Sequence, residues 1–131
     1  MALLTHRGSC HCGAVRFEVD ADLEAGTLRC NCSICRKTRA WLALVPADRF
    51  RLLAGEEMLA DYRFGPGRIR HRFCRSCGVR PFGMSTDGRS VAVQITCLDD
   101  LSPEQLAALP IVYVDGANDR FDRPPALTSW L

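Results

Sequence analysis

The sequence contains no long apolar run. No stretch approaches the roughly 18 consecutive apolar residues that a transmembrane helix requires. Residues 1–4 are likewise too few to form the apolar core of a signal peptide. We therefore expect a soluble, cytoplasmic protein that has no membrane partner.

The sequence also has little excess of charge of either sign. It carries 17 Lys and Arg residues against 15 Asp and Glu residues, a formal net charge of +2. No basic stretch with interleaved aromatic residues is present, although such stretches are typical of nucleic-acid-binding surfaces. We therefore expect no nucleic-acid partner.

Internal repeats, linkers and low-complexity segments are absent as well. The 131 residues match the length of one ordinary domain, and the 47% hydrophobic and 24% charged fractions are close to the globular average. We expect residues 1–131 to form a single domain.

Strand-like alternation is the main pattern between the Gly and Pro residues. Val15, Phe17 and Val19 share one face of the first such segment. Strands are also expected over residues 41–45 and 91–97, and residues 59–64 and 68–73 are expected to pair as a hairpin. The pattern predicts a mainly β fold.

The sequence predicts only one helix from clear capping residues. Ser102 is a suitable N-cap, Pro103 suits the first helical position, and Gln105 follows three residues after the cap. We expect a short helix near residues 103–109, ending before Pro110.

The eight cysteines are the most informative residues. They are too few for a typical disulfide-rich secreted chain, and a reducing cytosol would keep them free, so metal binding is favoured over a framework of four disulfides. Cys97 stands alone in the sequence. The other seven form two pairs and one triplet, and these are Cys10 and Cys12, Cys74 and Cys77, and Cys30, Cys32 and Cys35.

The spacing predicts two zinc sites. Structural zinc takes four ligands in a tetrahedron, and a cysteine pair in a tight turn supplies two of them. The simplest partition joins the two pairs into a closed four-thiolate Zn²⁺ site and leaves the triplet as a second Zn²⁺ site with an open fourth position. Such a position accepts water or a substrate, and a thiol substrate suits a sulfur-rich centre. We therefore predict that Cys30, Cys32 and Cys35 form a catalytic centre.

Other roles for nearby residues stay open. Cys97, His11 or His71 could complete the triplet and make both sites structural, with Cys97 the main candidate. We favour the interpretation that Cys97 is a small buried residue on its strand. We expect the His11 side chain to point away from the metal, and His71 to pack beside the closed site.

Four cations surround the triplet in the sequence, namely Arg29, Arg36, Lys37 and Arg39. Their charge would offset that of three metal-bound thiolates and attract an anionic ligand, although a solvated loop would have the same composition. We expect Arg36 and Lys37 to bind that ligand. Trp41 would either wall the pocket or, as is more common for tryptophan, pack in the core.

Three motifs carry a resemblance to a known family, supported by later segments at residues 97–100 and 115–119. They are Gly8-Ser9-Cys10-His11-Cys12-Gly13-Ala14-Val15-Arg16-Phe17, Cys30-Asn31-Cys32-Ser33-Ile34-Cys35-Arg36-Lys37 and Phe73-Cys74-Arg75-Ser76-Cys77-Gly78. In this order they resemble the glutathione-dependent formaldehyde-activating enzyme family, which also includes centromere protein V-type domains. The resemblance covers residues 8–119.

The resemblance implies several small antiparallel sheets, a structural zinc on the two cysteine pairs and a catalytic zinc on the triplet. It also implies a carbon–sulfur lyase whose reverse reaction condenses glutathione and formaldehyde to S-(hydroxymethyl)glutathione, with glutathione as the small-molecule partner. Two alternatives stay open: a noncatalytic zinc-binding module for a small thiol or a protein, and a redox sensor that uses the triplet. Residues 38–41 stand where family members often have small residues, so we expect a reshaped pocket.

Overall fold

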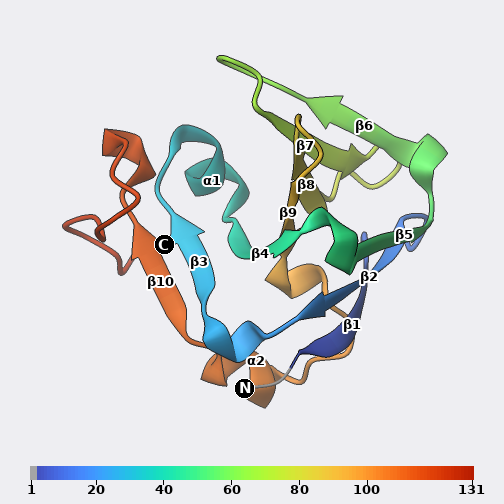
Figure 1. Cartoon of the computed structure of the whole chain (residues 1–131), viewed down its shortest axis with the longest axis horizontal. Helices are drawn as coiled ribbons and strands as arrows, with labels where there is room; N and C mark the ends of the chain where they lie inside the picture. The colour runs from blue at the N-terminus through green and yellow to red at the C-terminus, as the bar shows by residue number, and fades with distance from the viewer. Residues whose placement is uncertain (1–2) are drawn as a thin grey trace.

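The strands lie in two sheets in the computed structural model, which describes residues 3–131 (Figure 1). The smaller sheet has the order β1-β2-β5 and the larger one the order β10-β3-β4-β9-β8-β7-β6. The strand bounds are β1 Leu4–Ser9, β2 Arg16–Ala21, β3 Thr27–Cys30, β4 Trp41–Pro46, β5 Phe50–Ala54, β6 Leu59–Tyr62, β7 Ile69–Cys74, β8 Phe82–Ser85, β9 Ser90–Gln94 and β10 Ile111–Val114. The prediction of a mainly β fold is confirmed.

One strand pair among the described residues is parallel, whereas all the others are antiparallel. β10 runs alongside β3, with Ile111 opposite Thr27 and Val114 opposite Cys30. This pairing carries the chain to Asp115 at the same end of the sheet where β3 delivers Cys30. Segments far apart in the sequence therefore meet beside the cysteine triplet.

The predicted hairpin is confirmed, but one predicted strand is too long. β6 and β7 pair antiparallel, with Leu59 opposite Cys74. The strand expected over residues 91–97 ends at Gln94, and a 3₁₀ turn, Ile95–Cys97, follows it. Cys97 therefore lies on a turn and not on a strand. The alternation of apolar and polar residues continues to Cys97 in the sequence, but the backbone leaves the sheet after Gln94.

The two α-helices are short. α2 (Pro103–Ala108) has the predicted capping box, since the Gln105 amide donates to Ser102 Oγ at 3.1 Å and the Ser102 amide donates to Gln105 Oε1 at 2.8 Å. α1 (Ser33–Thr38) was not predicted, because it has six residues and none of them is buried, so it leaves no helical periodicity. None of the described helices has the length and apolarity needed to span a membrane.

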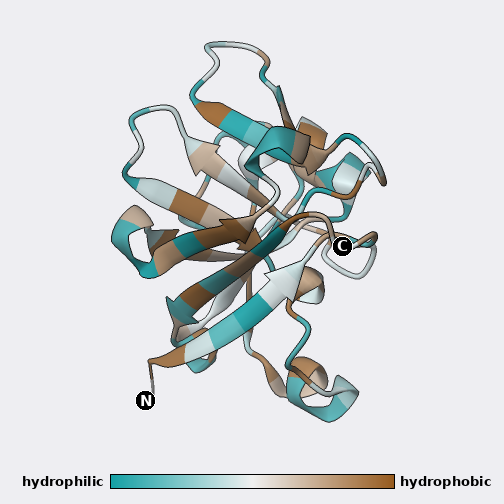
Figure 2. Ribbon diagram, turned by 90° about the vertical axis from the view of Figure 1, so that its right-hand side faces the viewer, coloured by the Kyte–Doolittle hydropathy of each residue, from teal (hydrophilic) through white to brown (hydrophobic). Residues whose placement is uncertain are grey.

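Three phenylalanines join the two sheets. Phe17 of β2 stacks on Phe50 of β5 with ring centroids 5.3 Å apart, and Phe50 lies 4.5 Å from Phe82 of β8. Hydrophobic and hydrophilic residues alternate along the strands in Figure 2, as expected for sheets with one buried face. The apolar faces of β2 and β8 thus meet in a common core, where Phe17 and Phe82 are almost completely buried.

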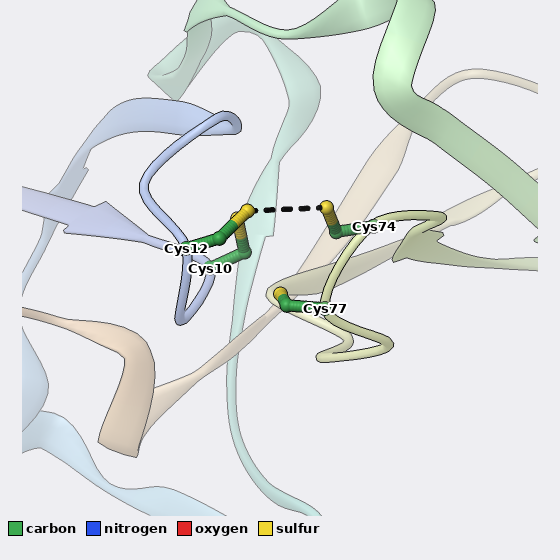
Figure 3. A group of neighbouring side chains, drawn as sticks. All are labelled: Cys10, Cys12, Cys74 and Cys77. Carbon is green, nitrogen blue, oxygen red and sulfur yellow. Dashed lines mark hydrogen bonds between the residues drawn. The ribbon is translucent and has the colours of Figure 1, made fainter.

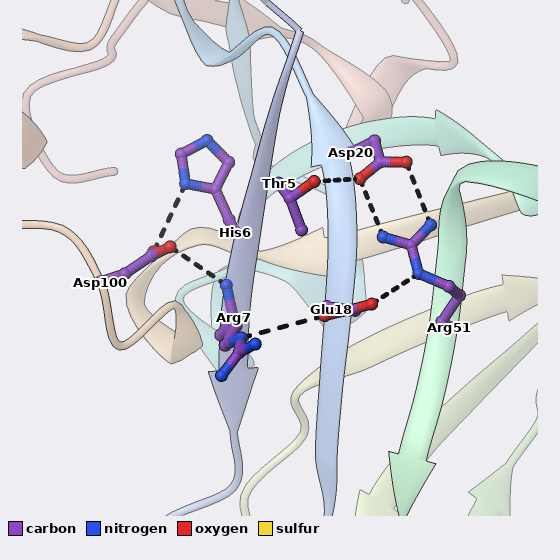
Figure 4. A network of polar contacts seen from close by, with 7 residues as sticks. All are labelled: Thr5, His6, Arg7, Glu18, Asp20, Arg51 and Asp100. Atoms are coloured by element: carbon purple, nitrogen blue, oxygen red, sulfur yellow. Dashed lines mark hydrogen bonds and ion pairs between the residues drawn. The ribbon is translucent and has the colours of Figure 1, made fainter.

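The outer face of the smaller sheet is held by charge (Figure 4). Arg51 of β5 donates to Glu18 at 2.8 Å and to both carboxylate oxygens of Asp20 at 2.8 and 3.0 Å, while Thr5 donates to Asp20 at 2.7 Å. The Arg51 guanidinium, together with Thr5, lowers the pKa of Asp20 to about 2. The contacts fix the register of β1, β2 and β5, because Glu18 and Asp20 alternate with buried residues of β2.

Truncation of Phe17 tests the role of the aromatic core. We expect Phe17→Ala to lower the free energy of unfolding by about 3–5 kcal/mol, because it opens a cavity between the sheets. Leu44→Ala is the control, since Leu44 is 63% exposed and its truncation should change stability by less than about 0.5 kcal/mol. Urea denaturation at a fixed zinc concentration measures both, and equal midpoints for the two variants would contradict this account.

Candidate metal centres

The closed site is formed by two tight turns. Cys10 and Cys12 lie between β1 and β2, whereas Cys74 ends β7 and Cys77 follows it (Figure 3). All four Sγ atoms lie within 4.8 Å of one another, as predicted from the spacing. Cys12 Sγ is 3.7 Å from both Cys10 Sγ and Cys74 Sγ. Zinc–sulfur bonds of 2.3 Å in a tetrahedron give sulfurs about 3.8 Å apart, so the four thiols fit Zn²⁺.

Glycine is required in both turns. Gly13 and Gly78 each follow the second cysteine of a pair, with φ of 81° and 78°. These left-handed angles suit glycine, which has no Cβ to clash with the backbone. Each turn is closed by a backbone hydrogen bond, 3.2 Å from the Gly13 amide to Cys10 and 2.8 Å from the Gly78 amide to Cys74. The turns therefore present their thiols in a fixed direction.

Backbone amides also favour ionisation in this site. The amide of Val79, followed by that of Cys12, lowers the pKa of Cys77 to about 6. The Val15 amide donates to Cys10 Sγ at 3.3 Å. Because metal-bound cysteine is a thiolate, these donors stabilise the form that binds zinc.

The triplet is built around the start of α1. Cys30 ends β3, Cys32 is the N-cap of α1, and Cys35 lies within the helix. Their Sγ atoms also lie within 4.8 Å of one another, and the Cys32 amide donates to Cys30 Sγ at 3.4 Å. Three thiols on one short turn can hold a metal ion and leave one position for another ligand.

The three thiols of the triplet differ in pKa. Hydrogen bonds from the thiols of Cys30 and Cys35 lower the pKa of Cys32 to about 2, whereas contacts with Cys30 and Cys32 raise the pKa of Cys35. Hydrogen bonding thus favours the thiolate form of Cys32. Binding of a metal by all three sulfurs must displace the remaining protons.

The candidates for a fourth protein ligand lie elsewhere. Within residues 3–131, no other Cys, His, Asp or Glu joins the triplet. His11 is exposed next to the closed site, and Cys97 is half-buried on its 3₁₀ turn, where burial raises its pKa to about 11. His71 does not pack beside the closed site as predicted. Its ring stacks on Phe64 at 5.4 Å, and the cysteine whose charge acts on it is Cys32 of the triplet.

A clamp of amide and carboxylate groups holds the chain after β10 over the triplet. Asn31, between two ligand positions, donates to Asp115 Oδ1 at 2.8 Å and accepts from the Ala117 amide at 2.9 Å. Asn118 donates to the other Asp115 oxygen at 2.9 Å. A Cβ on Gly116 would collide with Cys30 Sγ, so only glycine fits here. The sequence pointed to residues 115–119 only as a family segment, and did not predict this contact.

A cavity of about 960 Å³ opens beside the triplet. Its volume is at the upper end of the range for small-molecule sites. Cys32 contributes to its wall, and the side chains that give the wall its character are Arg36, Lys37, Asp119, Phe64 and Phe121. The predicted cations Arg36 and Lys37 therefore line a space that is large enough for a peptide-sized ligand.

The other predicted neighbours have structural contacts. Arg39 donates to the Trp130 backbone oxygen at 2.8 Å, and the Arg36 guanidinium lies 5.2 Å from the Trp130 ring centroid. Arg29 lies 5.0 Å from the ring centroid of Trp41. Trp41 itself is buried, with Nε1 donating to Thr27 Oγ1 at 2.7 Å, so it packs in the core and does not wall the large cavity.

Comparison with known proteins gives three findings. Residues 5–115 match the model of the family described as glutathione-dependent formaldehyde-activating enzyme. A Halomonas elongata protein that is provisionally named as such an enzyme is 64% identical over 31 residues, which are 24% of this chain and 20% of that protein's length. A crystal structure of a Rhodobacter sphaeroides protein superposes with a TM-score of 0.70 and 33% identity, covering 81% of this chain and 99% of that one.

Substitution of Gly116 tests the close approach of its backbone to the triplet. We expect Gly116→Ala to reduce bound zinc from two ions per chain to one, because the added methyl group must displace Cys30 Sγ or the clamp. Gly83→Ala is the control, since its Cβ would meet its nearest neighbour at an ordinary 3.4 Å. Elemental analysis of both variants measures the effect, and two zinc ions in Gly116→Ala would refute it.

Proposed function

The chain belongs to the glutathione-dependent formaldehyde-activating enzyme family, and from this premise we propose that it is a zinc-dependent enzyme of the carbon–sulfur lyase type. Its proposed substrate is a small thiol adduct, with S-(hydroxymethyl)glutathione, formed from glutathione and formaldehyde, as the specific assignment. Cys30, Cys32 and Cys35 are the proposed catalytic centre, and the closed site is the proposed structural one.

The observation that carries this proposal is the position of the triplet. Three thiols converge within 4.8 Å, no fourth protein ligand joins them among the described residues, and Cys32 forms part of the wall of the large cavity. Zinc held by these residues would supply a Lewis acid that keeps a substrate thiol ionised at neutral pH. A purely structural centre would be closed by a fourth residue and would not need a cavity.

The cavity suits the charges of glutathione. This tripeptide carries two carboxylates and one ammonium group besides its thiol. Arg36 and Lys37 can pair with the carboxylates, and Asp119 with the ammonium group. Phe64 and Phe121 add apolar walls for the peptide stem. These residues would hold the thiol at the side of the cavity where Cys32 lies.

The proposed step adds sulfur to a carbonyl carbon. The glutathione thiolate attacks formaldehyde, a carbon–sulfur bond forms, and the π electron pair of the carbonyl group moves to oxygen. The oxygen then takes a proton from water, which balances the proton that the thiol lost to solvent. Arg36 and Lys37 are the cavity cations that can stabilise the developing oxyanion, and binding in the cavity supplies proximity and orientation.

Substitution of Cys35 tests the proposed centre. We expect Cys35→Ala to bind one zinc ion in place of two, to lose glutathione binding and to lose turnover, because the triplet can no longer hold the metal. Cys97→Ala is the matched control, since Cys97 belongs to neither cysteine cluster and should retain all three properties. Elemental analysis, calorimetric titration with glutathione and an assay of adduct formation give the readouts.

The results separate the alternatives left open by the sequence. Glutathione binding without turnover in the unmodified protein would indicate a binding module. Reversible zinc release by mild peroxide, with no glutathione binding, would indicate a redox sensor based on the triplet. One zinc ion per chain, unchanged by Cys35→Ala, would refute the catalytic centre.

Chelation should distinguish the two sites by rate. We expect a chelator to remove zinc from the triplet first, because the triplet offers three protein ligands and the closed site four. The folded structure should persist after the first ion is lost, since the closed site joins the two sheets. Zinc release followed with a chromophoric chelator, alongside circular dichroism, would reveal two phases, and a single phase would contradict the prediction.

A further inference from the structure

Arg80 is a half-buried cation without a carboxylate partner. It lies between Cys77 and β8, and burial lowers its pKa. In the part of the chain that the structure describes, its guanidinium forms no ion pair with Asp or Glu, whereas Arg51, Arg70 and Arg72 each do. An arginine withdrawn from water needs other compensation for its charge.

The neighbours of Arg80 supply sulfur in place of carboxylate. Three cysteines lie near enough for their ionised forms to stabilise its charge, and these are Cys35, Cys32 and Cys97. Two of these belong to the triplet. Arg80 also lines a cavity of about 310 Å³ together with Thr38 at the end of α1 and Cys97 on its 3₁₀ turn. Thr38 follows Cys35 by three positions in α1, so Arg80 lies beside the helix that carries Cys35.

His71 fixes the direction of the guanidinium. Arg80 Nη1 lies 2.9 Å from His71 Nδ1. Because arginine can only donate, Nδ1 accepts and the ring carries its proton on Nε2. The ring is in turn stacked on Phe64, which lines the large cavity. Burial and the Arg80 charge both lower the pKa of His71, so the imidazole stays a neutral acceptor.

We propose that Arg80 is a positioning residue which, held by His71, stabilises negative charge on the sulfurs of the triplet and on a thiol bound beside them. This inference rests on the proposed function of the triplet. Three thiolates and a fourth sulfur ligand around Zn²⁺ would carry a net negative charge. Because Arg80 is half-buried, its positive charge is less screened by solvent than the charges of the exposed Arg36 and Lys37, so it offsets this negative charge more strongly. Arg80 acts through the sulfurs and does not bind the peptide part of the ligand.

The test compares two ligands, of which only one has a thiol that can ionise. Glutathione can bind as a thiolate, whereas S-methylglutathione has the same carboxylates and ammonium group but no thiol. In zinc-saturated protein we expect Arg80→Gln to weaken glutathione binding by about tenfold and to leave S-methylglutathione binding unchanged. Arg80→Lys should recover part of the loss, since it keeps the charge. His71→Phe should weaken glutathione binding less than Arg80→Gln does, because it removes only the orienting acceptor.

The controls separate this role from general charge and from folding. Arg89→Gln removes one exposed arginine far from the triplet in the sequence and should behave as the unmodified protein does. Retention of one zinc ion that resists chelation would show that Arg80→Gln keeps the closed site and the fold. Calorimetry gives both affinities, and the rate of zinc loss from the triplet gives a readout independent of turnover, expected to rise about tenfold in Arg80→Gln.

Two results would overturn the inference. Equal weakening of both ligands would assign Arg80 to the peptide part of glutathione, and unchanged affinities would remove any role for its charge. Failure of the unmodified protein to bind glutathione would instead refute the proposed function. The rate of zinc loss from the triplet would then decide the inference, and equal rates in Arg80→Gln and Arg89→Gln would reject it.

Discussion

The convergence of four thiols between the two sheets is the constraint on which the rest of the structure depends. Cys10 and Cys12 come from the turn between β1 and β2, and their partners come from the end of β7. Cys12 and Cys74 are 62 positions apart in the sequence, yet their sulfurs lie 3.7 Å from each other. A metal ion bound at this point would cross-link the sheets, and its binding energy would add directly to folding. The phenylalanine core and the charged outer face would then need only to hold sheets that the metal had already joined.

The two cysteine clusters differ in what surrounds them. The closed site draws its ligands from two stiff glycine turns and has a complete ligand set. The triplet draws its ligands from a strand end and a six-residue helix, and depends on the clamp between Asn31 and Asp115 for its cover. The difference in support agrees with the proposed roles, in which the closed site stabilises the fold and the triplet exchanges a ligand.

Features that depend on the spacing of residues close together in the chain could be predicted from the sequence. The cysteine pairs, the hairpin of β6 and β7 and the Ser102 capping box each depend on residues of one short continuous segment, so their patterns are visible in the sequence. The grouping of the seven cysteines followed from ligand number alone, and the structure brings the same residues together.

The remaining features depend on the packing of distant segments. The clamp requires β10 to lie parallel to β3, and nothing in either strand encodes that partner. The position of His71 beside Arg80 depends on how the segment after β7 folds back over that strand. The end of β9 at Gln94 and the short helix α1 are also set by neighbouring segments, because their own residues would permit other conformations.

The parallel pairing of β10 with β3 also has a consequence for biosynthesis. Asn31 and its clamp partner Asp115 are 84 positions apart, so at about 5–20 residues per second the ribosome adds the partner roughly 4–17 s later. During that interval the nascent chain presents three closely spaced thiols without their cover. The triplet therefore acquires its cover only after the segment that follows β10 has been synthesised, and until then its thiols are open to oxidation.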